Sequence, residues 1–168
     1  NSYLNENNVN SDLLIINPKK VDSKYLKKYK KDSKYFTGDD KPNFDDYDWI
    51  VDGIFGTGLN RDLNSEYFDI TKIISKKKNI ISIDIATGVY ADSGVLSNIA
   101  VKSAQTITFE SPKLGHFLSN GYSHTGELFI YSIGHKKNNK KSAGLIEAKD
   151  IFKIIKPRNI QSNKYLKG

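Results

Sequence analysis

Two acidic residues, Asp52 and Asp84, each follow a short apolar run, Trp-Ile-Val or Ile-Ile-Ser-Ile, and precede a glycine-containing loop. Both runs have the composition of buried strands in a parallel sheet. Because the carboxyl ends of parallel strands meet at one edge of a sheet, the loops over 52–62 and 84–94 are expected to form one site. Glycines let backbone amides approach a phosphate, and carboxylates can bind a hydroxyl group, a cation or a proton.

Simpler explanations exist for each of these features. A strand-end Asp such as Asp52 or Asp84 can cap the following helix, and a lone Gly-Thr-Gly can be ordinary turn chemistry. The placement of Asp at two strand ends favours a shared functional site over these simpler explanations. His116 and His124 are expected at the surface or in loops, and Lys113 either reaches the site or is solvated.

Hydrophobic periodicity predicts the elements that position these loops. The predicted strands span residues 12–16, 47–54, 80–83, 104–109 and 127–133, and the predicted helices span 21–31 and 65–78. Ser65 is the expected N-cap of the second helix. The residues expected to face the sheet are Tyr67, Ile70, Ile73 and Ile74. Strands alternating with helices predict an α/β fold, a Rossmann-like three-layer α/β/α sandwich with a mostly parallel sheet.

Composition excludes several classes of site. The 168 residues are 38% hydrophobic, enough for one domain with a core. The absence of cysteine excludes disulfides and thiolate metal sites, and the three histidines lack zinc-ligand spacing, so a metal would need oxygen ligands. No apolar run approaches the roughly 18 residues of a membrane helix, and no signal-peptide pattern is present. We therefore expect a cytoplasmic location and no membrane partner.

The formal net charge of +7 is concentrated in the last part of the chain. Residues 1–134 carry 16 Lys and Arg against 17 Asp and Glu, whereas residues 135–168 carry 10 against 2. Such a basic tail could bind a nucleic acid backbone. No aromatic ladder or groove-reading motif accompanies it, so the composition favours a solvated linker over a nucleic acid partner.

Three motifs occur in a characteristic order. Residues 51–61 read Val-Asp-Gly-Ile-Phe-Gly-Thr-Gly-Leu-Asn-Arg, and residues 83–89 read Ile-Asp-Ile-Ala-Thr-Gly-Val, with Asp-Ser-Gly at 92–94. The strand over 104–109 is followed by Pro-Lys-Leu-Gly at 112–115. Over roughly residues 1–134 this combination resembles the YjeF N-terminal domain family, which is NAD(P)H-hydrate epimerase.

The resemblance implies an isomerase of nicotinamide nucleotide repair, which interconverts the R and S forms of hydrated NADH or NADPH for an S-specific dehydratase. It implies a K⁺ cofactor bound by Asp52 and Thr87. The family's Pro-Ser-Gly is Ala-Thr-Gly here, and Thr keeps the hydroxyl. The residues that match the loop holding the dinucleotide are Gly56, Thr57, Gly58, Leu59, Asn60, Arg61 and Asp62. Asp84 matches a ligand-contacting carboxylate and is the favoured catalytic acid and base, because an Asp that binds K⁺ is a poorer acid.

The resemblance also implies a domain organisation. Residues 1–134 match an epimerase domain truncated at its N-terminus, 135–145 a basic linker, and 146–168 the start of a kinase-like, ADP- or ATP-dependent dehydratase domain in cis. The family's Asn-Asn-Gly-Gly-Asp-Gly loop, a source of phosphate-binding amides and a K⁺ ligand, is expected just before Asn1. The chain alone is therefore expected not to turn over substrate. A homodimer is a further expectation of the resemblance.

The main alternative is a non-enzymatic one. Domains of this fold also act as scaffolds in RNA-decay proteins, and the basic tail would suit an RNA partner. The presence of both strand-end aspartates together with the hydroxyls of Thr57 and Thr87 favours the enzyme, because a scaffold does not need them. A generic dinucleotide-binding module would not explain why the Gly-rich loop lacks the Gly-x-Gly-x-x-Gly form.

Overall fold

In the computed structural model of the chain, the described residues are 7, 9–17, 19, 21–22, 24, 35–37 and 40–134, with the backbone alone described over 35–37. The chain divides into two compact units, Asn1–His135 and Lys136–Gly168, and the second lies outside the described residues. The predicted linker and dehydratase segments therefore lie outside them, as does most of the helix predicted over 21–31. Among the residues described, no helix is long and apolar enough to cross a membrane.

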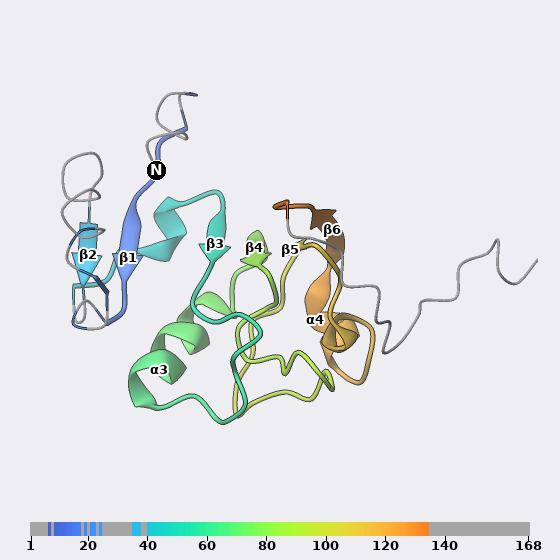
Figure 1. Ribbon diagram of the computed structural model, residues 1–168. Helices are drawn as coiled ribbons and strands as arrows, with labels where there is room; N and C mark the ends of the chain where they lie inside the picture. The colour runs from blue at the N-terminus through green and yellow to red at the C-terminus, as the bar shows by residue number, and fades with distance from the viewer. Residues whose placement is uncertain are drawn as a thin grey trace, which may run out of the picture. The chain divides into compact units, whose positions relative to one another are not determined.

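Four parallel strands form the main sheet of the first unit (Figure 1). They are β3 (Ile50–Asp52), β4 (Ile80–Ile83), β5 (Gln105–Phe109) and β6 (Glu127–Tyr131), and they lie side by side in that order. The predicted α/β fold with a mostly parallel sheet is confirmed. The predicted bounds of β4 are also confirmed, whereas β3 is shorter than the predicted 47–54. Its ladder is limited by the four-residue β4, which pairs only with residues 50–52.

A separate two-stranded sheet lies nearer the N-terminus. β1 (Leu13–Ile15) pairs in parallel with β2 (Tyr35–Thr37), and neither strand joins the main sheet. The first of these strands matches the prediction over 12–16, whereas the sequence analysis assigned no element to residues 35–37. A strand of three residues is too short to show a two-residue period in the sequence, and it is recognised here by its pairing with β1.

Helix α3 (Ser65–Ile74) follows the first of the two loops. Its N-cap is Asn64, whose side chain accepts a hydrogen bond from the Tyr67 backbone amide, so the prediction of Ser65 as the cap was wrong by one residue. The buried side chains are Ile70, Thr71 and Ile74. Ile73 is 37% exposed, so it does not face the sheet as predicted.

The helix also ends earlier than the predicted residue 78. Ser75 is its C-cap, and the backbone amide of Lys77 bonds to the carbonyl of Ile74 in a turn that follows the helix. The three lysines at 76–78 therefore lie beyond the helix, on the way to β4.

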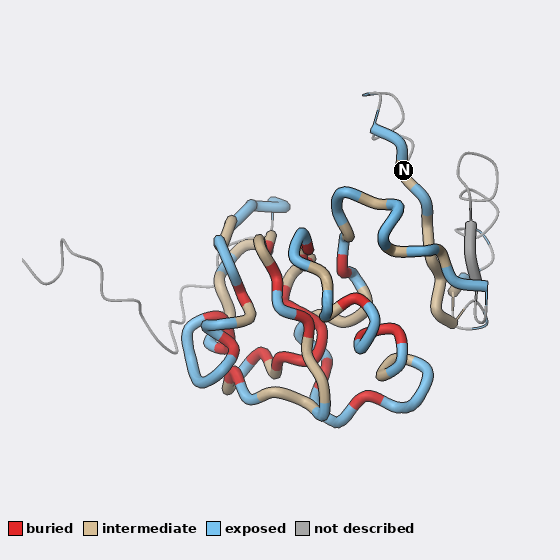
Figure 2. The backbone as a smooth tube through the Cα atoms, turned by 180° about the vertical axis from the view of Figure 1, so that it is seen from behind, coloured by how far each residue is buried: buried red, intermediate tan, exposed pale blue. Residues whose placement is uncertain are grey.

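The hydrophobic core continues from the sheet into the loop that follows β4 (Figure 2). It is a cluster of seven residues, Ile74, Ile80, Ile85, Ala86, Val89, Ala91 and Val101. In β4 and β5 alternate side chains are buried, as expected for strands whose two faces differ. Residues 85–91 pack in the core, so this part of the loop is held in place and is not exposed to solvent.

A segment with two short helices follows β5 and packs on the loop that follows β4. It consists of the 3-10 helix η3 (Leu114–His116) and the short helix α4 (Gly121–Thr125). The Gly115 amide donates to the Ala91 carbonyl at 2.6 Å, and a Cβ on Gly115 would lie 2.4 Å from the Tyr90 carbonyl oxygen. Only glycine permits this approach, which brings the residues around it to the carboxyl end of β4.

Candidate functional site

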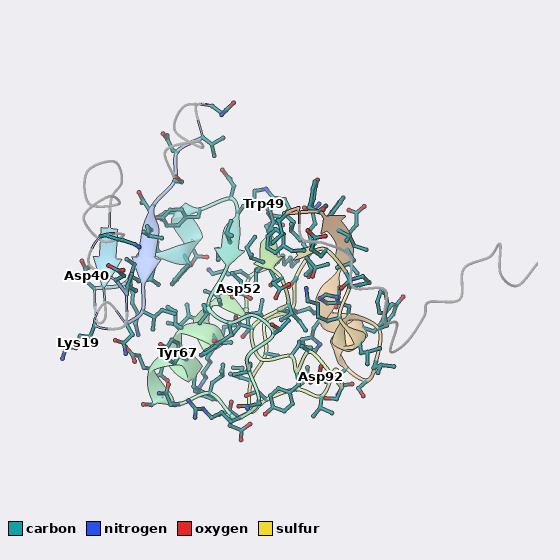
Figure 3. The ribbon with its side chains drawn as sticks, viewed as in Figure 1. Lys19, Asp40, Trp49, Asp52, Tyr67 and Asp92 are labelled. Atoms are coloured by element: carbon teal, nitrogen blue, oxygen red, sulfur yellow. The ribbon has the colours of Figure 1, made fainter. Side chains whose placement is uncertain are left out.

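Asp52 and Thr87, one from each loop, are in direct contact. The Thr87 hydroxyl donates to Asp52 Oδ1 at 2.7 Å, and the Thr87 amide donates to Asp52 Oδ2 at 2.9 Å. Figure 3 shows Asp52 at the end of β3, where the loops after the strands gather. Both residues are buried, with Asp52 1% exposed and Thr87 0%. The arrangement of parallel strands therefore brings the two predicted K⁺ ligands together.

Asp52 also accepts two further hydrogen bonds, from the Ser82 hydroxyl at 2.9 Å and from the Ile54 amide at 3.3 Å. Burial raises the pKa of Asp52, and the four hydrogen bonds oppose that effect by favouring the carboxylate. A carboxylate has about four acceptor positions, and protein donors occupy all of them here. Asp52 thus ties β3, β4 and the second loop together.

A carboxylate and a hydroxyl are ligands that suit a hard cation such as K⁺. In this arrangement a cation that bound both groups would take the place of the hydrogen bond between Thr87 Oγ1 and Asp52 Oδ1. Within the described part of the chain, no group of three or more His, Cys, Asp or Glu side chains is placed to hold a metal ion. The oxygen chemistry of Asp52 and Thr87 fits K⁺, at the expense of that hydrogen bond.

Asp84 adopts a left-handed backbone conformation, with φ of 71°. Asp tolerates this region better than most residues, although it still costs about 1 kcal/mol or more. Its amide donates to the Ile107 carbonyl at 2.6 Å, and its carbonyl lies 3.0 Å from His116 Nε2. A strained conformation held on both sides is typical of functional positions.

The Asp84 side chain is half-buried and charged. Its Oδ1 accepts from the Thr108 hydroxyl at 3.1 Å and from Lys113 Nζ at 2.5 Å. Burial opposes ionisation, but the Lys113 ammonium and the hydrogen bonds from Thr108 and the Thr57 amide outweigh it and hold the pKa of Asp84 below its usual value. At neutral pH the group is therefore a carboxylate.

Lys113 and His116 were not among the predicted site residues, yet both contact Asp84. Lys113 reaches the site, which resolves the two possibilities left by the sequence, and its side chain is 19% exposed. His116 is 1% exposed, so its expected surface position was wrong. The signal that could have identified them is Gly115, because a glycine between Lys and His marks a close backbone approach.

The His116 ring is neutral and has a defined tautomer. Its Nδ1 accepts from the Lys113 backbone amide at 3.1 Å, so its Nε2 carries the proton that it donates to the Asp84 carbonyl. Burial lowers the pKa of His116, in agreement with this neutral form. His124, by contrast, is partly exposed in α4 and bonds to the Asn120 carbonyl.

The first loop passes next to the Asp84 carboxylate. A Cβ on Gly56 would lie 3.2 Å from Asp84 Oδ2, and the Phe55 amide donates to Thr87 Oγ1 at 3.2 Å. The loop therefore lies against both Asp84 and Thr87, and the Thr57 amide stabilises the charge of Asp84.

The other predicted dinucleotide-binding residues lie further along the same loop. Leu59 is buried and anchors the loop, while the Asp62 carboxylate accepts from the Asn98 amide at 3.0 Å. Gly58, Asn60 and Arg61 are exposed. Leu59 and Asp62 thus hold the loop in place, and exposed residues lie on both sides of Leu59.

Comparison with known proteins relates these features to a family. The family described as "YjeF-related protein N-terminus" matches residues 2–115. A bifunctional NAD(P)H-hydrate repair enzyme of Thermofilum pendens is 37% identical over 92 residues, which cover 54% of this chain and 18% of that protein. An NAD(P)H-hydrate epimerase of Oenococcus oeni is 36% identical over 96 residues, which cover 55% of this chain and 46% of that protein. The chain thus spans less than half the length of these two relatives.

A solved structure is similar in fold. The crystal structure of the yeast protein ynu0 has a TM-score of 0.64 and 19% sequence identity, and the match covers 87% of this chain and 66% of that one. At this identity the likeness supports the fold alone.

Proposed function

The chain belongs to the YjeF-related N-terminal family, and from this membership we propose that it is an isomerase that interconverts the R and S forms of hydrated NADH and NADPH. The observation that carries the proposal is the Asp84 carboxylate, which is ionised, half-buried and adjacent to the Gly56–Thr57 backbone. It lies at the carboxyl ends of parallel strands, where open α/β sheets bind their ligands.

The chemistry needs one proton to be taken up and one to be released. The hydroxyl on the epimerised ring carbon gains a proton from the solvent and leaves as water, which breaks its C–O bond. Water then adds to the opposite face, forms a new C–O bond and releases a proton. As a carboxylate, Asp84 accepts the released proton and stabilises positive charge on the ring, which general base and electrostatic catalysis require.

The first loop would bind the dinucleotide. Its exposed stretch, with Gly58, Asn60 and Arg61, offers backbone amides and a guanidinium group to the pyrophosphate. Gly56 and Thr57, which lie against Asp84, would position the hydrated ring over the carboxylate.

Asp52 and Thr87 would hold K⁺. Bound there, the ion would offset the negative charge of the pyrophosphate. In this proposal Asp52 supplies a carboxylate oxygen and Thr87 a hydroxyl oxygen where the two loops meet. The hydrogen bond between the two side chains already places these oxygens next to each other. The Thermofilum pendens relative is named a bifunctional repair enzyme, which supports a second repair activity in cis. In this proposal that activity is the dehydratase that consumes the S form.

A coupled assay tests the proposal. The protein at its natural length and the 168-residue chain are each mixed with both forms of hydrated NADPH and an S-specific dehydratase, in K⁺ or Na⁺ buffer. For the protein at its natural length, loss of the R form faster than its spontaneous epimerisation is the expected result, with a higher rate in K⁺. If the R form disappears at the spontaneous rate in the presence of the folded protein at its natural length, the enzyme proposal is wrong and a scaffold role is favoured.

A further inference from the structure

The ammonium group of Lys113 donates all of its hydrogen bonds to protein acceptors. Its Nζ donates to Asp84 Oδ1 at 2.5 Å, to Thr108 Oγ1 at 2.8 Å and to the Phe109 carbonyl at 3.2 Å. An ammonium has three donors, so each of them has a protein acceptor. Lysine is normally one of the most exposed residues, whereas this side chain is 19% exposed. Lys113 is therefore fixed in position.

The two carboxylate oxygens of Asp84 have different surroundings. Oδ1 accepts from both Lys113 and Thr108, whereas Oδ2 lies beside the Cα of Gly56, in the loop proposed to hold the substrate. The ion pair thus engages one oxygen and leaves the other directed to the first loop.

The segment that carries Lys113 also holds the Asp84 backbone. His116, three residues later in the same turn, donates from Nε2 to the Asp84 carbonyl and accepts at Nδ1 from the Lys113 amide. The close approach of Gly115 docks this turn on the second loop. Residues 113–116 therefore fix the side chain and the left-handed backbone of Asp84 together.

From these contacts we infer that Lys113 is a positioning residue of the proposed epimerase reaction, which anchors Oδ1 of Asp84 so that Oδ2 accepts the proton of the adding water. The inference deepens the proposed function and rests on it. The inference requires a positive charge at residue 113, because a nearby cation lowers the pKa of Asp84 and a neutral residue of similar length does not. The titratable side chains that face Asp84 are Lys113 itself and the neutral His116.

Two variants separate this role from a purely structural one. Lys113→Met removes the charge and keeps the length, and Lys113→Arg keeps a cation. We expect Lys113→Met to lower kcat on the order of 100-fold with little change in KM, and to move the acidic limb of the kcat/KM profile to higher pH. Lys113→Arg is expected to restore most of kcat and the position of that limb. Lys102→Met, at an exposed lysine, is the matched control and should behave as wild type.

Two activity results would overturn the inference. Full activity of Lys113→Met would show that Asp84 does not need its partner. A Lys113→Arg variant that is as slow as Lys113→Met, although its acidic limb stays at the wild-type pH, would show that holding Asp84 ionised is not what Lys113 contributes, and would favour Lys113 as a proton donor.

A measurement without substrate distinguishes failure of the inference from failure of the proposed function. Unfolding of the 168-residue chain in urea is compared for wild type, Asp84→Asn, Lys113→Met and the double variant. The ion pair predicts non-additive losses of stability at pH 7, and additive losses would overturn the inference whatever the activity. Non-additive losses in a protein that does not epimerise the hydrates would instead refute the proposed function and leave the pairing of Asp84 with Lys113 intact.

Discussion

Replacing Asp52 by asparagine tests whether this buried carboxylate ties the two loops together. The side chain accepts four hydrogen bonds, two at each oxygen, and two of the four donors are the backbone amides of Ile54 and Thr87. Asparagine keeps one acceptor oxygen and places an NH₂ group at the other position. Each oxygen of Asp52 receives one of the backbone amides, so either orientation of the asparagine sets an NH₂ against a backbone N–H.

The expected loss follows from the donors left without an acceptor. The Ser82 hydroxyl can turn to Ser103 Oγ, 2.6 Å away, but a backbone N–H cannot turn. One unpaired buried N–H lowers stability by about 1–3 kcal/mol. Asp52→Ala leaves both amides unpaired, and so about 2–6 kcal/mol is expected. The larger value is a substantial part of the roughly 5–15 kcal/mol that stabilises a domain.

The assay is urea unfolding of the 168-residue chain in a buffer free of K⁺, followed by circular dichroism. Asp48→Asn is the matched control, because Asp48 is exposed and precedes the same strand, and a change within about 0.5 kcal/mol is expected there. A loss for Asp52→Asn no larger than that of the control would refute the description of Asp52 as the tie between the loops.

Three further predictions follow from the same geometry. A Cβ at Gly115 would lie 2.4 Å from the Tyr90 carbonyl oxygen, so Gly115→Ala should lower the free energy of unfolding in urea by about 1–3 kcal/mol. Gly53→Ala is the control, because a Cβ there has nothing within 4 Å, and its stability should not fall. Equal losses for the two variants would contradict the close approach of Gly115. The lowered pKa of Asp84 adds stability that is fully present above its unfolded pKa, near 3.8, and is lost as pH falls through the folded value. The stability gap between wild type and Asp84→Asn should therefore narrow in acid, and a gap independent of pH would contradict the pairing. If Asp52 and Thr87 bind K⁺, the ion should raise the midpoint of urea unfolding, because it binds the folded state. Thr87→Val should lose this rise while Thr87→Ser keeps it, and a rise retained in Thr87→Val would exclude the hydroxyl as a ligand.

The local sequence was sufficient to predict the strands of the main sheet. The apolar runs before Asp52 and Asp84 are rich in isoleucine and valine, which favour strands, and both form strands of the main sheet. The direction of parallel strands then places both loops at one edge. The contact between Asp52 and Thr87, 35 residues apart, follows from that arrangement.

Contacts that depend on three-dimensional packing could not be predicted in the same way. Lys113 is 29 residues from Asp84, and nothing in its immediate neighbours indicates an ion pair. Its place depends on how η3 docks against the second loop. The backbone conformation of Asp84 is likewise set by partners from β5 and η3, and local propensity alone would favour ordinary dihedral angles.

The N-cap of α3 was predicted one residue too late because two neighbouring residues can each cap a helix. Asn64 and Ser65 are both good N-caps, and the choice between them depends on which side chain reaches the Tyr67 amide. The expected helix face also differed, because Thr71 is buried whereas Ile73 is 37% exposed.

The measurement that tests the central claim most directly is the rate of loss of the R form of hydrated NADPH in the coupled assay, compared for wild type, Asp84→Asn and Asp69→Asn. Asp69 is exposed on α3, so its variant makes the same chemical change away from the site. If Asp84 is the ionised proton acceptor, Asp84→Asn should lose on the order of 100-fold or more of the catalysed rate while Asp69→Asn remains at the wild-type rate. Equal rates for the two variants in folded protein would contradict the assignment of the reaction to Asp84.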